Sequence, residues 1–175
     1  HDANQLMHRH AGASDHLVSE AIYLTDPEGN GIEIYADRKP VEWKWEGPNI
    51  RMATERLNFQ TLMTENGGDN SGWSGAPDGS MIGHVHLRVG DAKDAEAWWH
   101  EEMKFDTVAH YGGQAVFLST GGYHHHIGAN VWHSRGAGKR DLDRTGLGWV
   151  EMKSKAGPAK TVSDPWGTEI RVVGE

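Results

Sequence analysis

The chain contains no cysteine. This absence excludes disulfide bonds, thiolate metal sites and a cysteine nucleophile. Any metal ion held by side chains must therefore be bound by His, Asp or Glu. Histidine is abundant, with 12 in 175 residues, so the search for chemistry begins with histidines and carboxylates.

The chain also lacks a basic stripe and a long apolar run. Its net charge of -8 and pI near 5.8 argue against binding to a phosphate backbone, so nucleic acid is not an expected partner. No run of 18 apolar residues is present, and the opening HDANQLMHRH has no apolar core of the kind found in secretory signals. We therefore expect a cytoplasmic protein without a membrane partner.

Apolar residues make up only 37% of the chain, whereas glycine accounts for 23 of its 175 residues. That glycine content is about twice the average share and is typical of a sheet protein with many tight turns. The length allows one domain or two small modules, and it is sufficient to bury a core.

Three stretches of the sequence are versions of one another: AIYLTDPEGNGIEIY, AVFLSTGGYHHHIGA and AKTVSDPWGTEIRV. Each is typical of a strand, a tight turn and a second strand. Each also places a possible metal ligand directly before an isoleucine, namely Glu33, His126 and Glu169. The repetition favours a metal site built by duplication over a chance scatter of polar residues.

The first of these hairpins, at 18–37, is the most regular feature of residues 1–40, which we interpret as the remnant of a first module. Residues 1–10 suggest the tail of a helix or a frayed end. Residues 41–80 contain GP, NGG, NSG and APDG, which predict a linker. The remainder, 81–175, is expected to form a second module.

This second module opens with a β-α-β-β-β pattern. We predict a strand at 81–89, a helix at 92–103, and strands at 105–111, 114–119 and 124–132. A further strand at 147–152 and the last hairpin follow without a helix between them, which indicates a shortened copy of the same unit. The fold class is therefore α+β, with incomplete first and last units.

Strand alternation assigns the histidines to faces. The apolar stripe of the helix is expected to cover Val85, Leu87 and Val89, so His84 and His86 point away from the helix. The same alternation in the strand at 124–132 places His124 and His126 on the polar face and His125 on the apolar side. In the last hairpin Glu169 lies opposite Ile170.

The candidate ligands are therefore His84, His126 and Glu169, separated by 42 and 43 residues, as equivalent places in repeated units would be. His124 shares the face of His126 and is an alternative ligand. A solvated surface position remains the alternative for each of these side chains.

Several strings are more specific than the pattern alone. GASDHLVSEAIYLTDPEGNGIEIYADR, MIGHVHLRV and YGGQAVFLSTGGYHHHIGANVW resemble the two-module bacterial catechol-2,3-dioxygenase-like proteins of the vicinal oxygen chelate superfamily (glyoxalase, bleomycin resistance and extradiol dioxygenase proteins). The resemblance implies β-α-β-β-β units that form a curved mixed sheet around a metal. Carried over by position, it implies His84, His126 and Glu169 as metal ligands, while the fourth position falls near Leu147, which cannot ligate.

The resemblance also implies a divalent metal, Fe(II) in the first place and Zn, Mn or Ni as alternatives, with a catechol-like or vicinal-oxygen compound as substrate. Extradiol enzymes use a further histidine before the final hairpin as acid or base. The corresponding segment KSKAGPAKT has none, and its counterpart His16 precedes the first hairpin. The candidates for this catalytic role are His86, His124 and Tyr111.

The leading functional hypothesis is a metal-dependent extradiol dioxygenase that cleaves a catechol ring with O₂. The alternatives are a glyoxalase-type isomerase or lyase, which needs no O₂, and a ligand-binding module of the same fold without catalysis. A half-unit hairpin leaves an open strand edge and an uncovered apolar face, so we also expect a homodimer.

Overall fold

The computed structural model describes residues 10–65, 74–155 and 157–174. Most of the segment 1–10, expected to be a helix tail or a frayed end, therefore lies outside the described residues. The chain divides into two compact units, His1–Met81 and Ile82–Glu175. Across the described ranges, no helix combines the length and the apolar character needed to cross a membrane.

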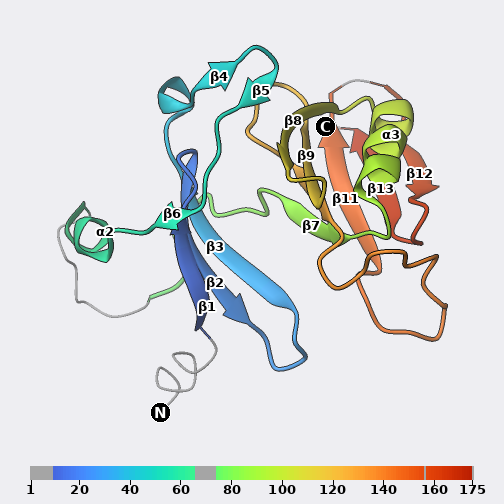
Figure 1. Ribbon diagram of the computed structural model, residues 1–175, viewed down its shortest axis with the longest axis horizontal. Helices are drawn as coiled ribbons and strands as arrows, with labels where there is room; N and C mark the ends of the chain where they lie inside the picture. Colours follow the sequence, from blue (N-terminus) through green and yellow to red (C-terminus); the bar gives the residue numbers. More distant parts are fainter. Residues whose placement is uncertain (1–9, 66–73, 156, 175) are drawn as a thin grey trace. The chain divides into compact units, whose positions relative to one another are not determined.

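The first unit is built on a four-stranded sheet in the order β3-β2-β1-β6 (Figure 1). Its strands are β1 (His10–Asp15), β2 (Ser19–Thr25), β3 (Gly31–Asp37) and the short β6 (Glu55–Arg56). The hairpin predicted at 18–37 is β2 and β3, which pair antiparallel from Ser19 opposite Asp37 to Thr25 opposite Gly31. In its turn, Gly29 adopts a φ of 90°, a conformation that favours glycine.

The segment 41–80, predicted to be a linker, contains secondary structure of its own. The structure shows a 3₁₀ turn η1 (Pro40–Glu42), paired strands β4 (Trp45–Glu46) and β5 (Asn49–Ile50), and the helix α2 (Phe59–Glu65). Trp43 is buried, and its indole N–H donates to the carbonyl of Val18 at 3.2 Å. Part of this segment therefore packs onto the first unit. It does so through single large side chains such as Trp43, which give no regular spacing in the sequence that would predict a strand or a helix.

The second unit contains the predicted β-α-β-β-β arrangement. Its elements are β7 (Val85–Arg88), α3 (Ala92–Met103), β8 (Asp106–Tyr111), β9 (Ala115–Ser119) and β10 (Ile127–Asn130). The sheet order is β7-β10-β9-β8. β7 and β10 are parallel, whereas β9 pairs antiparallel with both β10 and β8. The α+β class is confirmed.

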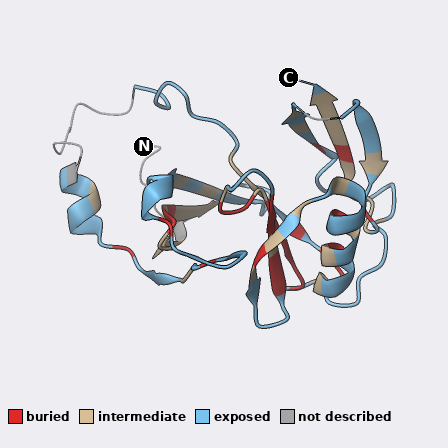
Figure 2. Cartoon of the chain, turned by 90° about the horizontal axis from the view of Figure 1, so that it is seen from above, coloured by how far each residue is buried: buried red, intermediate tan, exposed pale blue. Residues whose placement is uncertain are grey.

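Local interactions determine where α3 begins and ends. The carboxylate of Asp91 caps its start by accepting hydrogen bonds from the backbone N–H groups of Lys93 and Asp94, and Lys104 ends it in the left-handed region. Ala95 and Trp99 are buried against the sheet, whose strands carry most of the buried residues, while the outward surface of the helix is exposed (Figure 2). As predicted, Leu87 and Val89 belong to this core.

The last three strands form a shortened version of the same unit. They are β11 (Trp149–Ser154), β12 (Lys160–Ser163) and β13 (Glu169–Gly174), in the order β11-β13-β12 with β11 parallel to β13. This repeats the order β7-β10-β9 without the helix and the fourth strand. Val150 and Ile170 join the core of the second unit, although the two sheets are separate and not one continuous curved sheet.

Candidate metal centre

Each of the three related hairpins holds its candidate ligand by an internal hydrogen bond. The hydroxyl of Tyr23 donates to Glu33 at 3.1 Å. Nδ1 of His126 lies 3.0 Å from the Ser119 hydroxyl, and Nε of Arg171 donates to Glu169 at 2.6 Å. The three positions differ in register and in chemical surroundings, since Glu169 lies opposite Ser163 at the start of β13 whereas Glu33 lies opposite Tyr23, two residues into β3.

Three imidazoles come together at the start of β7. His84, His86 and His125 each offer a ring nitrogen, and these three atoms lie within 4.8 Å of one another. The ring centroids of His84 and His125 are 4.3 Å apart, and those of His84 and His86 are 5.2 Å apart. His125 is buried whereas His86 is exposed, so the cluster is accessible from one side.

The sheet register explains why the cluster forms. β10 lies beside β7 with Gly128 opposite His86, and the His86 ring rests over this glycine. A Cβ atom at Gly128 would lie 2.6 Å from Cε1 and Nδ1 of His86, closer than real contacts allow. Phe117, opposite Gly128 on β9, packs edge-on against the rings of His86 and His125. The glycine and the phenylalanine thus shape a cradle for the imidazoles.

The structure differs from the expectation that His125 lies on the apolar side. Strand alternation was applied to 124–132, but β10 begins only at Ile127. His125 therefore lies before the paired residues of β10, where strand alternation does not apply, and its side chain joins those of His84 and His86. The sequence shows the pair His84 and His86, but it does not show the register that places Gly128 opposite His86.

His126, the predicted ligand, lies close to this cluster but is not one of its three members. Its ring contacts Phe105 and Tyr123, with centroid distances of 5.8 and 4.9 Å. Burial lowers the pKa of His126, and the charges of His124 and His84 lower it further. A depressed pKa favours the neutral ring at neutral pH, which is the form that can ligate a metal.

His124, one of the candidate acid or base residues, is fully buried beside the cluster. Its Nδ1 lies 2.8 Å from Nδ1 of His125. Two ring nitrogens at this distance share a hydrogen bond only if one carries the proton and the other does not. His124 is therefore coupled to a member of the cluster through a single proton.

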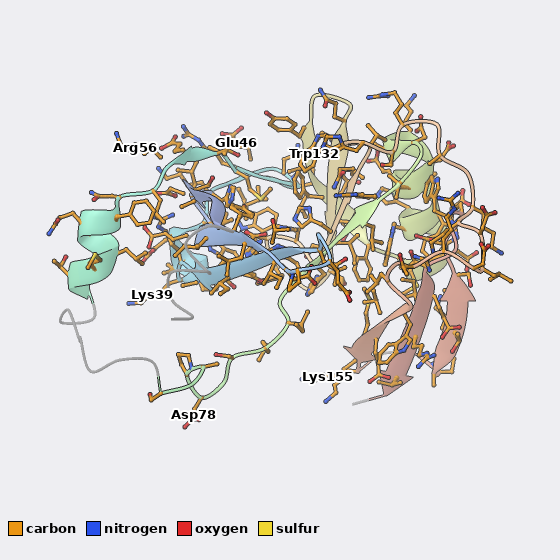
Figure 3. The ribbon with its side chains drawn as sticks, turned by 90° about the horizontal axis from the view of Figure 1, so that it is seen from below. Lys39, Glu46, Arg56, Asp78, Trp132 and Lys155 are labelled. Carbon is orange, nitrogen blue, oxygen red and sulfur yellow. The ribbon has the colours of Figure 1, made fainter. Side chains whose placement is uncertain are left out.

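The structure does not bring Tyr111 or Glu169 into the cluster. Tyr111 pairs with Ala115, and Ala115 pairs with Asn130. Asn130 lies three residues beyond Ile127, the first residue of β10, so Tyr111 is displaced about 10 Å along the sheet from the end where the histidines lie. Its ring lies edge-on to that of Trp132 instead, with 6.4 Å between the ring centroids; Trp132 is labelled in Figure 3. Glu169 is bonded to Arg171, whose guanidinium lies 4.4 Å from the ring centroid of Trp149.

The three-histidine cluster suits a divalent metal ion. Imidazole is a ligand for Zn, Ni, Cu and Fe. Nitrogens bound to one ion at about 2.0–2.1 Å lie roughly 3–3.4 Å apart, so the rings must move closer together than in the structure to share an ion. Three protein ligands leave further coordination positions open, as in catalytic metal sites.

The fold and the cluster together define a β-α-β-β-β module, followed by a shortened copy, with imidazoles gathered at its first strand. The chain is 43% identical over 143 residues to catechol-2,3-dioxygenase of Bacillus subtilis (strain 168), a match that covers 81% of this chain and 50% of that protein. The chain is therefore homologous to a bacterial catechol-2,3-dioxygenase, which confirms the resemblance found in its sequence. It spans about half the length of this curated relative.

No family model matches the chain. Among solved structures, a lactoylglutathione lyase from Agrobacterium tumefaciens aligns with a TM-score of 0.41 and 15% identity, covering 57% of this chain and 96% of that one.

Proposed function

We propose that the chain supplies the metal-binding module of an extradiol, catechol-2,3-dioxygenase-type enzyme. The observation that carries this proposal is the cluster of His84, His86 and His125 in a chain 43% identical to a protein of that name. The substrate class is a catechol-like compound with two adjacent oxygens.

The ligand set is also part of the proposal. His84 belongs both to the cluster and to the set expected from the repeat, so we assign it as the first ligand. The remaining ligands come from His86 and His125, which the geometry favours, or from His126 and Glu169, which the repeat favours. Nε of Arg171 donates a hydrogen bond to Oε1 of Glu169 at 2.6 Å. To ligate the ion, Glu169 must either use its other oxygen or give up this hydrogen bond.

A bound divalent ion, Fe(II) in the first place, would supply a Lewis acid for two adjacent substrate oxygens and an electron source for O₂. The chain's own contribution is the handling of protons. In the ligand set with His126 and Glu169, where His125 does not bind the ion, the hydrogen-bonded pair His124 and His125 (2.8 Å between their Nδ1 atoms) keeps one free ring nitrogen, which can accept a proton from a substrate hydroxyl and return it later. The exposed His86 stands at the open side of the cluster and is placed to contact the substrate.

The test is to load the protein with Fe(II) under anaerobic conditions, add catechol and then admit air. A yellow ring-fission product, measured by its visible absorbance, is expected. The same assay with Zn, Mn and Ni, and with His84→Ala as the control, separates ring cleavage from background oxidation of catechol. Absence of colour with every metal, despite measurable metal binding, would contradict the dioxygenase and favour a binding module.

A homodimer is also proposed. β3 is an edge strand of the first sheet, and both Ile32 and Ile34 on it are exposed. An exposed edge with apolar side chains favours pairing with another chain. Light scattering at micromolar concentration is expected to give twice the chain mass, and a monomer would contradict this proposal.

A further inference from the structure

A second group of potential ligands lies on the outer surface of the second unit, between α3 and β8. Glu96 and His100 are four residues apart on α3, which places them on one face, one turn from each other. Thr107 and His110 come from β8. None of these side chains belongs to the histidine cluster at the start of β7.

An irregularity in β8 brings its two side chains to the same side. Thr107 and His110 are three residues apart, and regular alternation would direct them to opposite faces. The register between β8 and β9 shifts between Thr107 and Ala109. Such a bulge re-aims side chains, and both Thr107 and His110 consequently reach Glu96.

The hydrogen bonds of the group are centred on the Glu96 carboxylate. The Thr107 hydroxyl donates to Oε1 at 2.6 Å, and Nε2 of His110 lies 3.1 and 3.2 Å from Oε1 and Oε2. Nε2 of His100 lies 2.8 Å from the Thr107 hydroxyl. Because the Thr107 hydroxyl donates its single proton to Glu96, it can only accept from His100, which must donate through Nε2–H.

The carboxylate is kept ionised by these neighbours. Partial burial would raise the pKa of Glu96, but the hydrogen bonds from Thr107 and His110 and the charges of both histidines hold it below its ordinary value. The side chains of His110 and Glu96 are 55% and 24% exposed, so an ion from solvent can reach them. One carboxylate and two imidazoles are a common donor set for Zn²⁺ and other divalent transition ions.

We propose that Glu96, His100 and His110 form a surface site for a divalent transition-metal ion such as Zn²⁺. Glu96 and His110 are already in contact, and the ion takes the place of the hydrogen-bonding proton between Nε2 of His110 and the Glu96 carboxylate. His100 is one hydrogen bond further away, so its ring moves to replace the Thr107 hydroxyl beside Glu96. The bound ion ties the helix to the edge strand of the sheet.

The test is calorimetric titration with Zn²⁺ in a His84→Ala background, which removes the main ligand proposed for the other centre. Glu96→Gln and His110→Gln are each expected to weaken this binding at least about tenfold, on the scale of a lost ligand or its close support. Thr107→Val is expected to leave binding unchanged or to strengthen it, because the competing hydroxyl is gone. His133→Asn, which changes an exposed histidine elsewhere, is the matched control and should have no effect.

A second readout guards against variants that only perturb folding. Zn²⁺ is expected to raise the melting temperature of the His84→Ala protein, the parent of these variants, because a ligand that binds the folded state stabilises it. This rise should disappear in His110→Gln, whose metal-free melting temperature should match the parent. Equal Zn²⁺ affinity in the parent, Glu96→Gln and His110→Gln proteins would overturn the proposal, as would weakening by Thr107→Val comparable with theirs.

Discussion

Replacing His84 with alanine is expected to lower the affinity of the chain for Fe(II) or Zn²⁺ by more than about 100-fold. Loss of a group that merely supports a ligand costs about 10- to 100-fold in metal affinity, and a direct ligand is expected to cost more. His84 contacts both other members of the cluster, with centroid distances of 4.3 and 5.2 Å. Calorimetric titration, with metal analysis of the purified proteins, measures the change.

Paired variants identify the remaining ligands. If the cluster of the structure binds the ion, His125→Ala weakens binding strongly and His126→Ala weakly. If the repeat determines the ligands, the order reverses and Glu169→Gln also weakens binding. Unchanged affinity in the His84→Ala protein would contradict both assignments.

Gly128→Ala offers a further check that leaves every imidazole in place. The added methyl group meets the His86 ring at 2.6 Å, so the ring must turn away from the cluster. We expect weaker metal binding if His86 is a ligand and little change if it is not. Circular dichroism of the metal-free variant verifies that the sheet is retained.

Much of the second unit was predictable because its pattern is repeated and regular. Alternation in β7 correctly separated Leu87 and Val89, which are buried, from the exposed His86. The helix was identified from its apolar stripe, and the structure shows that the carboxylate of Asp91 caps its start. The shortened last unit followed from the absence of helical spacing before the final hairpin. These signals are local, and local patterns are readable in a single sequence.

The position of His125 could not be predicted in the same way. Alternation applies only inside a ladder, and the sequence does not show that β10 begins as late as Ile127. The contact of His86 with Gly128 depends on the parallel register of β7 and β10, strands separated by the helix and two further strands. Such non-local registers depend on core packing, which no short sequence window contains.

The comparison of the three hairpins explains why only one of them leads to the cluster. Each holds its ligand-position residue by a hydrogen bond within the hairpin, and the middle copy lies beside β7, whose residues His84 and His86 gather with His125. In the last copy the corresponding strand is β11, which opens with Trp149 and pairs it with Glu169. The indole therefore stands where the equivalent unit has an imidazole, and it stacks with Arg171 instead of binding an ion.

Replacing Trp99 with alanine is expected to produce the largest loss of stability in the second unit, about 3–5 kcal/mol, as for other large aromatic side chains removed from cores. Trp99 is only 1% exposed and packs against Trp98 and Phe105. It is the main side chain by which α3 covers the sheet that carries the histidines. Urea unfolding followed by circular dichroism measures the change.

Trp98→Ala is the matched control, since it removes the same side chain from the neighbouring position. Trp98 is only partly buried at the edge of the core, and a partly exposed side chain contributes less transfer free energy and leaves a smaller cavity. Its loss should therefore cost clearly less than that of Trp99. Equal destabilisation by the two variants would show that α3 does not hold the sheet through Trp99, and the arrangement of the core described above would need revision.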